Sequence, residues 1–174
     1  MFKKIIFILL GIIATLIIGF IVIGLVKPTC HTACSVTVNA PASKTFEVFN
    51  NPENMGKWMD NFISIENISG EKNQIGSKWK MVFNENGREL VITETITAFE
   101  QDKLFAFEFE DEFAKFLIQI HFDEVNGQTT ISQTSDGEGK GMAAKSMIAL
   151  MRGVMEKQQI GMYNKLKELV EKTQ

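Results

Sequence analysis

An uninterrupted apolar run opens the chain. Residues Ile5 to Val26 carry no charge, and Thr15 and three glycines are their only members without an apolar side chain. A helix rises about 1.5 Å per residue, so these 22 residues would extend roughly 33 Å. That length is enough to cross a hydrocarbon core about 30 Å thick. The run therefore predicts one membrane-spanning helix over residues 5–26.

A cleaved signal peptide is the other structure that such a run can encode. Its apolar region would be about 7–15 residues long and would end at a small-residue cleavage site. The run here is longer, and the Lys-Pro-Thr-Cys sequence of residues 27–30 lacks an Ala-x-Ala pattern, so we expect an uncleaved single-pass anchor. Lys3 and Lys4 precede it, and only Lys27 and His31 follow it closely. The positive-inside rule then favours a domain outside the cytoplasm.

Alternation of apolar and polar residues dominates the middle of the chain. Trp79, Met81 and Phe83, for example, fall on one face of a strand, with Lys78 and Lys80 on the other, and this period of two is typical of half-buried strands. Asn-Gly pairs at 86–87 and 126–127 predict tight hairpin turns. By this pattern, strands are expected at residues 35–38, 62–68, 77–84, 88–99, 105–110, 115–124 and 128–135.

Helical spacing flanks the strands. Two short helices are expected at residues 43–49 and 52–59, the second with proline at its favoured first position. One long helix is expected at residues 142–172, where methionine, valine and leucine recur at three- and four-residue steps. Before it, residues 136–141 contain three glycines and predict a flexible loop that ends the sheet.

Composition and charge narrow the class of protein. A chain of 174 residues suits one domain, and 45% hydrophobic with 22% charged residues excludes wholesale disorder. The net charge is −3, and it becomes −5 when Lys3 and Lys4 are set aside with the anchor. Nucleic-acid binding normally needs a basic patch, so no nucleic-acid partner is expected.

The order of elements predicts an α+β fold. A curved sheet cannot bury its concave face alone, and the long terminal helix is the only expected element large enough to cover that face. A helix laid across a curved sheet leaves a hollow between them. We divide the chain into a membrane anchor (residues 1–27), a juxtamembrane linker (28–33) and a single domain (34–174).

Four sequence segments carry a resemblance to a known family, namely Val36–Phe49, Asn51–Trp58, Gly76–Trp79 and Leu166–Glu171. On these segments, residues 34–172 resemble the START-like, Bet v 1-like (SRPBCC) superfamily of polyketide cyclase/dehydrase and lipid transport proteins. The resemblance implies a helix-grip fold, in which a curved antiparallel sheet wraps around the C-terminal helix and encloses a cavity for apolar or amphipathic ligands. The chain also looks like small bacterial members with one anchor, which implies the bacterial plasma (inner) membrane.

Residues expected to line the cavity are mostly aromatic, aliphatic or methionine. Methionine is unbranched and adapts to varied ligands, although each of these residues would serve equally well as ordinary core. The candidates are Trp58, Trp79, Met81, Phe83, Ile92, Glu94, Phe107, Phe109, Ile118, Ile120, Met147 and Met151.

Glu94 is the one acidic residue on an apolar strand face, between Ile92 and Ile96. If it is buried without a partner, its pKa rises and it can serve as an acid, a base or a ligand anchor. The alternative is that it faces water, either at the edge of the sheet or through a strand bulge that turns its side chain outward. His121 alternates with apolar residues and is expected to point outward.

Cys30 and Cys34 follow the anchor with His31 between them. They are compatible with a local disulfide, a metal pair, an acylated juxtamembrane cysteine or two incidental thiols. Together with His31 they would supply three metal ligands, whereas a closed zinc site needs four. We expect no metal and no cofactor.

The sequence thus favours a membrane-anchored binding protein for a hydrophobic or amphipathic small molecule, such as a lipid. Catalysis is the less favoured interpretation. The first alternative is an enzyme of the cyclase or dehydrase type with Glu94 or His121 as its acid or base. The second alternative is a protein-interaction module in which the space between helix and sheet is packed solid.

Overall fold

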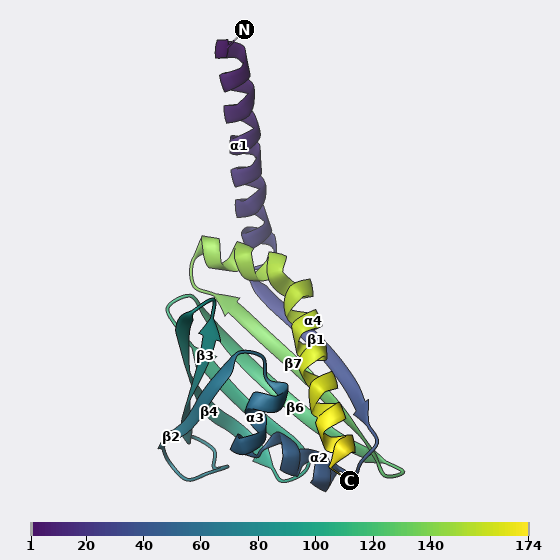
Figure 1. Cartoon of the computed structure of the whole chain (residues 1–174). Coiled ribbons are helices and arrows are strands. Elements are labelled where there is room, and N and C mark those ends of the chain that lie inside the picture. The colour runs from purple at the N-terminus through teal and green to yellow at the C-terminus, as the bar shows by residue number, and fades with distance from the viewer. Residues whose placement is uncertain (1, 174) are drawn as a thin grey trace.

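A computed structural model describes residues 2–173 of the chain. Within these residues the chain forms four helices and seven strands (Figure 1). The helices are α1 (Phe2–Val26), α2 (Ala42–Phe49), α3 (Pro52–Trp58) and α4 (Met142–Lys172). The strands are β1 (Thr29–Val38), β2 (Phe62–Ser69), β3 (Lys78–Glu85), β4 (Arg88–Glu100), β5 (Leu104–Glu110), β6 (Ala114–Val125) and β7 (Gln128–Gly139).

The seven strands form one antiparallel sheet in the order β1-β7-β6-β5-β4-β3-β2. The expected hairpins are present, and Asn86, Gly87, Asn126 and Gly127 all have the positive φ that tight turns require. Figure 1 shows α4 lying across the curved sheet, with α2 and α3 beside it. The helix-grip fold and its α+β class are therefore confirmed.

The main core lies between the sheet, the two short helices and the second half of α4. Phe46 and Phe49 of α2 pack edge-on against Phe122 of β6, with ring centroids 5.1 and 5.2 Å away. Leu166 and Val170 of α4 are fully buried in the same cluster. The last turns of α4 are therefore part of this tightly packed core.

The first strand is longer than the alternation at residues 35–38 suggested. It begins at Thr29, which pairs with Glu138 of β7, so the stretch expected to be a linker (28–33) contributes five residues to the sheet. Cys30, Thr32 and Cys34 are buried on the inner face of this strand. The sequence signal for this longer strand was an alternation of small residues that are only weakly apolar.

The glycine-rich stretch at 136–141 is not a loop: strand β7 continues through it to Gly139. A Cβ at Gly137 would lie 2.5 Å from Phe116 Cε1, and one at Gly139 would lie 2.4 Å from the backbone nitrogen of Lys145. These glycines therefore permit close packing of a ring and of a helix against the strand. Composition alone suggested flexibility instead.

Helix α1 extends away from the sheet (Figure 1). Its segment Lys3–Val26 is long and apolar enough to cross a membrane, since an 18-residue window of it has a mean hydropathy of 3.2 and contains no buried residue. Its last turns lie beside α4, because Ser146 Oγ donates a hydrogen bond of 2.6 Å to the carbonyl oxygen of Phe20. Figure 1 shows the first turns of α4 crossing the base of α1 before α4 bends to follow the sheet.

Candidate ligand-binding cavity

A cavity of about 170 Å³ lies between the sheet, α3 and the second half of α4. Its wall is mainly apolar, with a few polar groups. The lining residues are Phe49, Asn50, Met55, Trp58, Met59, Met81, Glu94, Phe105, Phe107, Ile118, Ile120, Gln133, Gln159, Met162 and Tyr163. A mainly apolar wall with a few fixed polar groups is typical of small-molecule sites.

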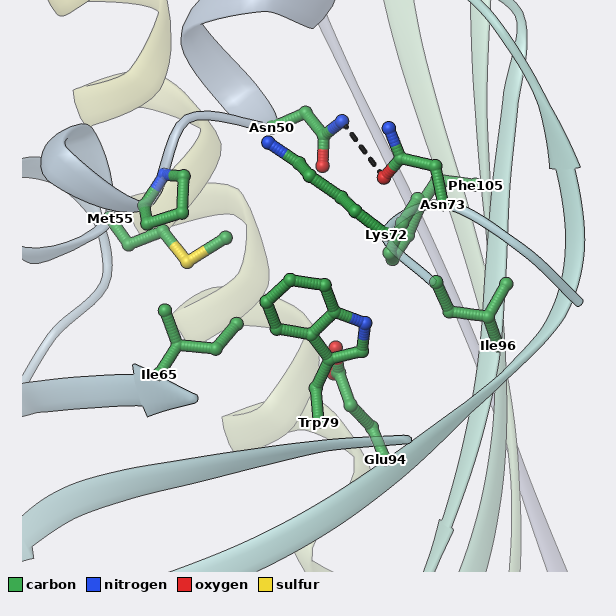
Figure 2. Close-up of a pocket in the computed structure, with 10 residues that line it drawn as sticks. Asn50, Met55, Ile65, Lys72, Asn73, Trp79, Glu94, Ile96 and Phe105 are labelled. Carbon is green, nitrogen blue, oxygen red and sulfur yellow. Dashed lines mark hydrogen bonds between the residues drawn. The ribbon is translucent and has the colours of Figure 1, made fainter. Parts of the chain in front are cut away.

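A second hollow of about 20 Å³ adjoins the cavity and shares Asn50, Met55, Glu94 and Phe105 with it. Figure 2 shows this hollow, with Trp79 and Glu94 close together on one side of it. On the opposite side, Asn50 Nδ2 donates a hydrogen bond of 3.2 Å to Asn73 Oδ1. The hollow has room for about one water molecule.

Glu94 joins the two hollows. It lies on β4, paired in register with Trp79 of β3 and Phe109 of β5, and its side chain is only 5% exposed. Burial raises its pKa from 4.5 to about 7, and among the described residues it has neither a hydrogen bond nor an ion pair. The carboxyl group is therefore divided between its charged and neutral forms near pH 7, and both forms lack a partner.

Two indole groups in the wall also lack partners. The Nε1 atoms of Trp58 and Trp79 are buried without a hydrogen-bond acceptor in the described chain. The Trp58 ring is held in place by stacking against Phe49 and Tyr163, with centroids 5.5 and 6.3 Å away. An unpaired buried donor costs about 1–3 kcal/mol, so an acceptor brought by a ligand would be stabilised there.

Other polar groups of the wall satisfy one another. The Tyr163 hydroxyl donates a hydrogen bond to Gln133 Oε1, and Thr32 Oγ1 donates one of 3.4 Å to Gln159 Oε1. Burial raises the pKa of Tyr163 well above 10, so the phenol stays neutral. These bonds link α4 to β7 and β1, which positions this side of the wall.

Seven of the twelve predicted lining residues lie on a wall of one or both hollows. Six of these line the larger cavity, and Trp79 lines the smaller hollow, where Glu94 is also found. The seven are Trp58, Trp79, Met81, Glu94, Phe107, Ile118 and Ile120.

The other five predicted residues lie away from the cavity. Phe83 packs edge-on against Phe62, and Phe109 stacks on Phe116 with centroids 5.0 Å apart. Ile92 is half-buried on β4 outside both walls. Met147 and Met151 belong to the first half of α4, where they are 44% and 43% exposed.

Sequence reasoning missed the part of α4 that forms the wall. Gln159, Met162 and Tyr163 lie three and four positions apart and so share one side of the helix. The available signal was Tyr163, the single tyrosine of the chain. Asn50, which follows α2, and Met55, which lies within α3, were also missed as lining residues.

Cys30 and Cys34 are separate buried thiols on the inner face of β1. Residues four apart in a strand are about 13 Å apart, whereas a disulfide needs Cα atoms within about 7 Å, so the local disulfide is excluded. Burial raises the pKa of both thiols. His31 points outward, with Nδ1 2.7 Å from Asp136 Oδ1, and the described residues contain no cluster placed to hold a metal.

His121 is exposed on β6 and does not line the cavity. The outward direction predicted from its alternation is therefore correct. This position removes His121 as an acid or base for a reaction inside the cavity, so Glu94 is the only one of the two candidates that lies there.

A mainly apolar cavity between a curved antiparallel sheet and a long C-terminal helix defines the class of protein. Residues 29–171 match the family described as "Polyketide cyclase / dehydrase and lipid transport". The chain belongs to this family. A comparison with curated protein sequences finds no match.

Solved structures share the fold at low sequence identity. Ara h 8.0201 is 18% identical with a TM-score of 0.66, over 83% of this chain and 99% of that one. The Zhui aromatase/cyclase from Streptomyces sp. R1128 is 13% identical with a TM-score of 0.68, over 82% and 94%. A START superfamily protein from Mycobacterium smegmatis is 13% identical with a TM-score of 0.67, over 83% and 99%.

Proposed function

We propose that the chain is a membrane-anchored binding protein that holds an amphipathic small molecule in the cavity between its sheet and α4. The observation that carries the proposal is a mainly apolar cavity in which one carboxyl group, that of Glu94, has no protein partner. The family's lipid transport members and the aromatase/cyclase of similar fold support a ligand with a large apolar part.

The size of the cavity limits the ligand. A volume of about 170 Å³ is close to that of an engineered cavity of about 150 Å³ that binds benzene. It is smaller than typical ligand pockets of about 300–1,000 Å³. Met55, Met59, Met81 and Met162 line it, and methionine side chains reorient readily. The cavity therefore fits a ring-sized group directly, and larger groups by movement of these four side chains.

The unpaired groups define the polar part of the ligand. A cationic amine would hold Glu94 in its charged form, and a hydroxyl would bond to either form. The Nε1 atoms of Trp58 and Trp79 require an acceptor. We infer an apolar ring or chain that carries an amine or hydroxyl group together with a carbonyl or ether oxygen.

The membrane part of the proposal rests on α1. Its length and hydropathy suit a membrane span, and Lys3 and Lys4 precede the apolar run. We propose that α1 stays attached as a single-pass anchor in a bacterial inner membrane, with the domain outside the cytoplasm. A reporter enzyme fused after residue 174 should be active only outside the cytoplasm, and cytoplasmic activity would overturn this orientation.

Calorimetry tests the ligand directly. The full chain in lipid nanodiscs is titrated with 1-naphthylmethylamine and with 1-naphthoic acid, which share a ring and differ in charge, and empty nanodiscs give the background. We expect tighter binding of the amine, and loss of that preference in Glu94→Gln. Equal affinities would overturn the role of Glu94. No binding of either probe, with no small molecule extracted from the purified chain, would overturn the binding function.

A second candidate function is catalysis, and one observation favours it. A carboxyl group with a pKa near 7 inside a cavity is suited to general acid or base work. In that case Glu94→Gln would keep ligand affinity and lose turnover. The interaction-module alternative required a solidly packed space between helix and sheet, and a cavity of about 170 Å³ argues against it.

A further inference from the structure

A stripe of exposed apolar side chains runs along the first half of α4. Met147, Leu150, Met151 and Val154 are 44%, 57%, 43% and 51% exposed. Their spacing of three and four places them on one side of the helix. Contiguous exposed apolar side chains mark contact sites for partners or membranes, and we call these four residues the α4 stripe.

The opposite side of this helical segment is polar. Arg152 Nε donates a hydrogen bond of 3.1 Å to Glu156 Oε1, and both side chains lie close enough to Cys30 of β1 to influence its pKa. At about 100° per residue, Lys145 and Arg152 lie on the side of the helix away from the α4 stripe. The segment is therefore amphipathic, with its polar side toward β1 and its apolar side uncovered.

Contacts with α1 fix the position of this segment of α4 along the axis of α1. Ser146 Oγ bonds to the Phe20 carbonyl oxygen, and a Cβ at Gly24 would lie 2.4 Å from Ser146 Oγ, so the two helices touch. Phe20 lies six residues before Val26, the last residue of the apolar run, which is about 9 Å along the helix axis. Amphipathic surface helices bury their apolar side about 5–10 Å into the membrane boundary.

We propose that the first half of α4 is an interfacial helix whose stripe lies in the boundary layer of the bilayer that α1 spans. The inference rests on the membrane span proposed above, and it adds a second membrane contact made by the domain itself. The occupant of the stripe is lipid, because the exposed side chains lie beside the last turns of an apolar helix whose surface, apart from its contact with α4, is uncovered.

Quenching by brominated lipid tests this contact in the full chain. Leu150→Trp places a reporter on the α4 stripe. Val125→Trp is the matched control: Val125 is 66% exposed and ends β6, at the end of the sheet away from Thr29, where β1 leaves the anchor. Both variants are placed in phosphatidylcholine/phosphatidylglycerol vesicles with brominated acyl chains. Emission is compared with that of the parent chain, which contributes Trp58 and Trp79.

We expect the added emission of Leu150→Trp to shift to the blue and to lose most of its intensity in brominated vesicles, while Val125→Trp is unaffected. Carbonate extraction of the same vesicles separates the possible failures. A chain that resists extraction but shows no quenching at position 150 would overturn the interfacial helix and leave the span intact. A chain released by carbonate would overturn both. Protection from aqueous iodide without quenching by lipid would assign the stripe to a protein partner instead.

Discussion

Glu94 and Trp79 are directly paired across β4 and β3, and neither the carboxyl group nor the indole N–H has a partner in the described chain. Paired residues of antiparallel strands project from the same face, so both groups border the same small hollow. An unpaired acid next to an unpaired donor destabilises the empty protein. A ligand that pairs with both would recover that free energy on binding.

Glu94 should make stability fall as the pH rises. Its pKa is about 7 in the folded protein against 4.5 in the unfolded chain, so the folded state binds the proton more tightly. No penalty exists below about pH 4.5, and the full penalty of roughly 3 kcal/mol is present above pH 7. Urea unfolding of Glu94→Gln should therefore show higher stability than the parent at pH 8 and little difference at pH 4.5.

The matched control for this prediction is Glu89→Gln. Glu89 is exposed and lies on the same strand, so its replacement should leave the pH dependence of unfolding unchanged. If Glu94→Gln and the parent protein lost stability equally between pH 5 and pH 8, the carboxyl group would not be the source of the effect.

The bond between Tyr163 and Gln133 should contribute to stability. Tyr163→Phe leaves Gln133 Oε1 buried without its donor, which costs about 1–3 kcal/mol. Adding Gln133→Met removes the stranded acceptor, so the double variant should be more stable than Tyr163→Phe alone. Chemical denaturation of the parent, the two single variants and the double variant measures this, and additive losses would show that the two groups do not interact.

Glycine at 137 should be required for packing. Gly137→Ala brings a Cβ against the Phe116 ring, and such overpacking costs about 1–3 kcal/mol. Gly153→Ala is the contrasting variant, because open space surrounds that position in α4 and alanine favours a helix by about 1 kcal/mol. Thermal unfolding should move in opposite directions for the two, and a shared direction would contradict the packing argument.

Cys30 and Cys34 should not form a disulfide with each other. Because they project from the same face of an extended strand four residues apart, the intact mass should be the same with and without reductant. Modification by iodoacetamide should be slow in the folded protein, since burial raises both pKa values. A mass lower by two hydrogens before reduction would show that β1 is not formed at this point.

The sequence predicted the elements that obey simple periodicity. The bounds of α4 matched the expected residues 142–172, and the strand pattern gave the antiparallel sheet. It also singled out Glu94, because an acid between Ile92 and Ile96 interrupts an apolar face. The small, weakly apolar residues of 28–33 and the glycines of 136–141 concealed strand pairing, since their packing depends on residues far along the chain.

The position of the cavity along α4 could not be predicted from the spacing of apolar residues. Met147, Met151, Met162 and Tyr163 all fit one amphipathic helix, and spacing cannot tell which turn lies over the hollow. The structure places the wall at the later turns and leaves the earlier ones beside α1. Which turns of α4 lie over the cavity depends on the position at which β7 ends and α4 begins.

Only Lys27 and Pro28 separate the end of α1 from the start of β1. Such a short connection, with a rigid proline, gives the domain almost no reach beyond its own footprint. If α1 spans the bilayer, the binding site travels only as far as the anchor drifts in the plane of the membrane. It then cannot carry cargo across a gap between two membranes. The proposed ligand would then reach the cavity by diffusing to the anchored domain.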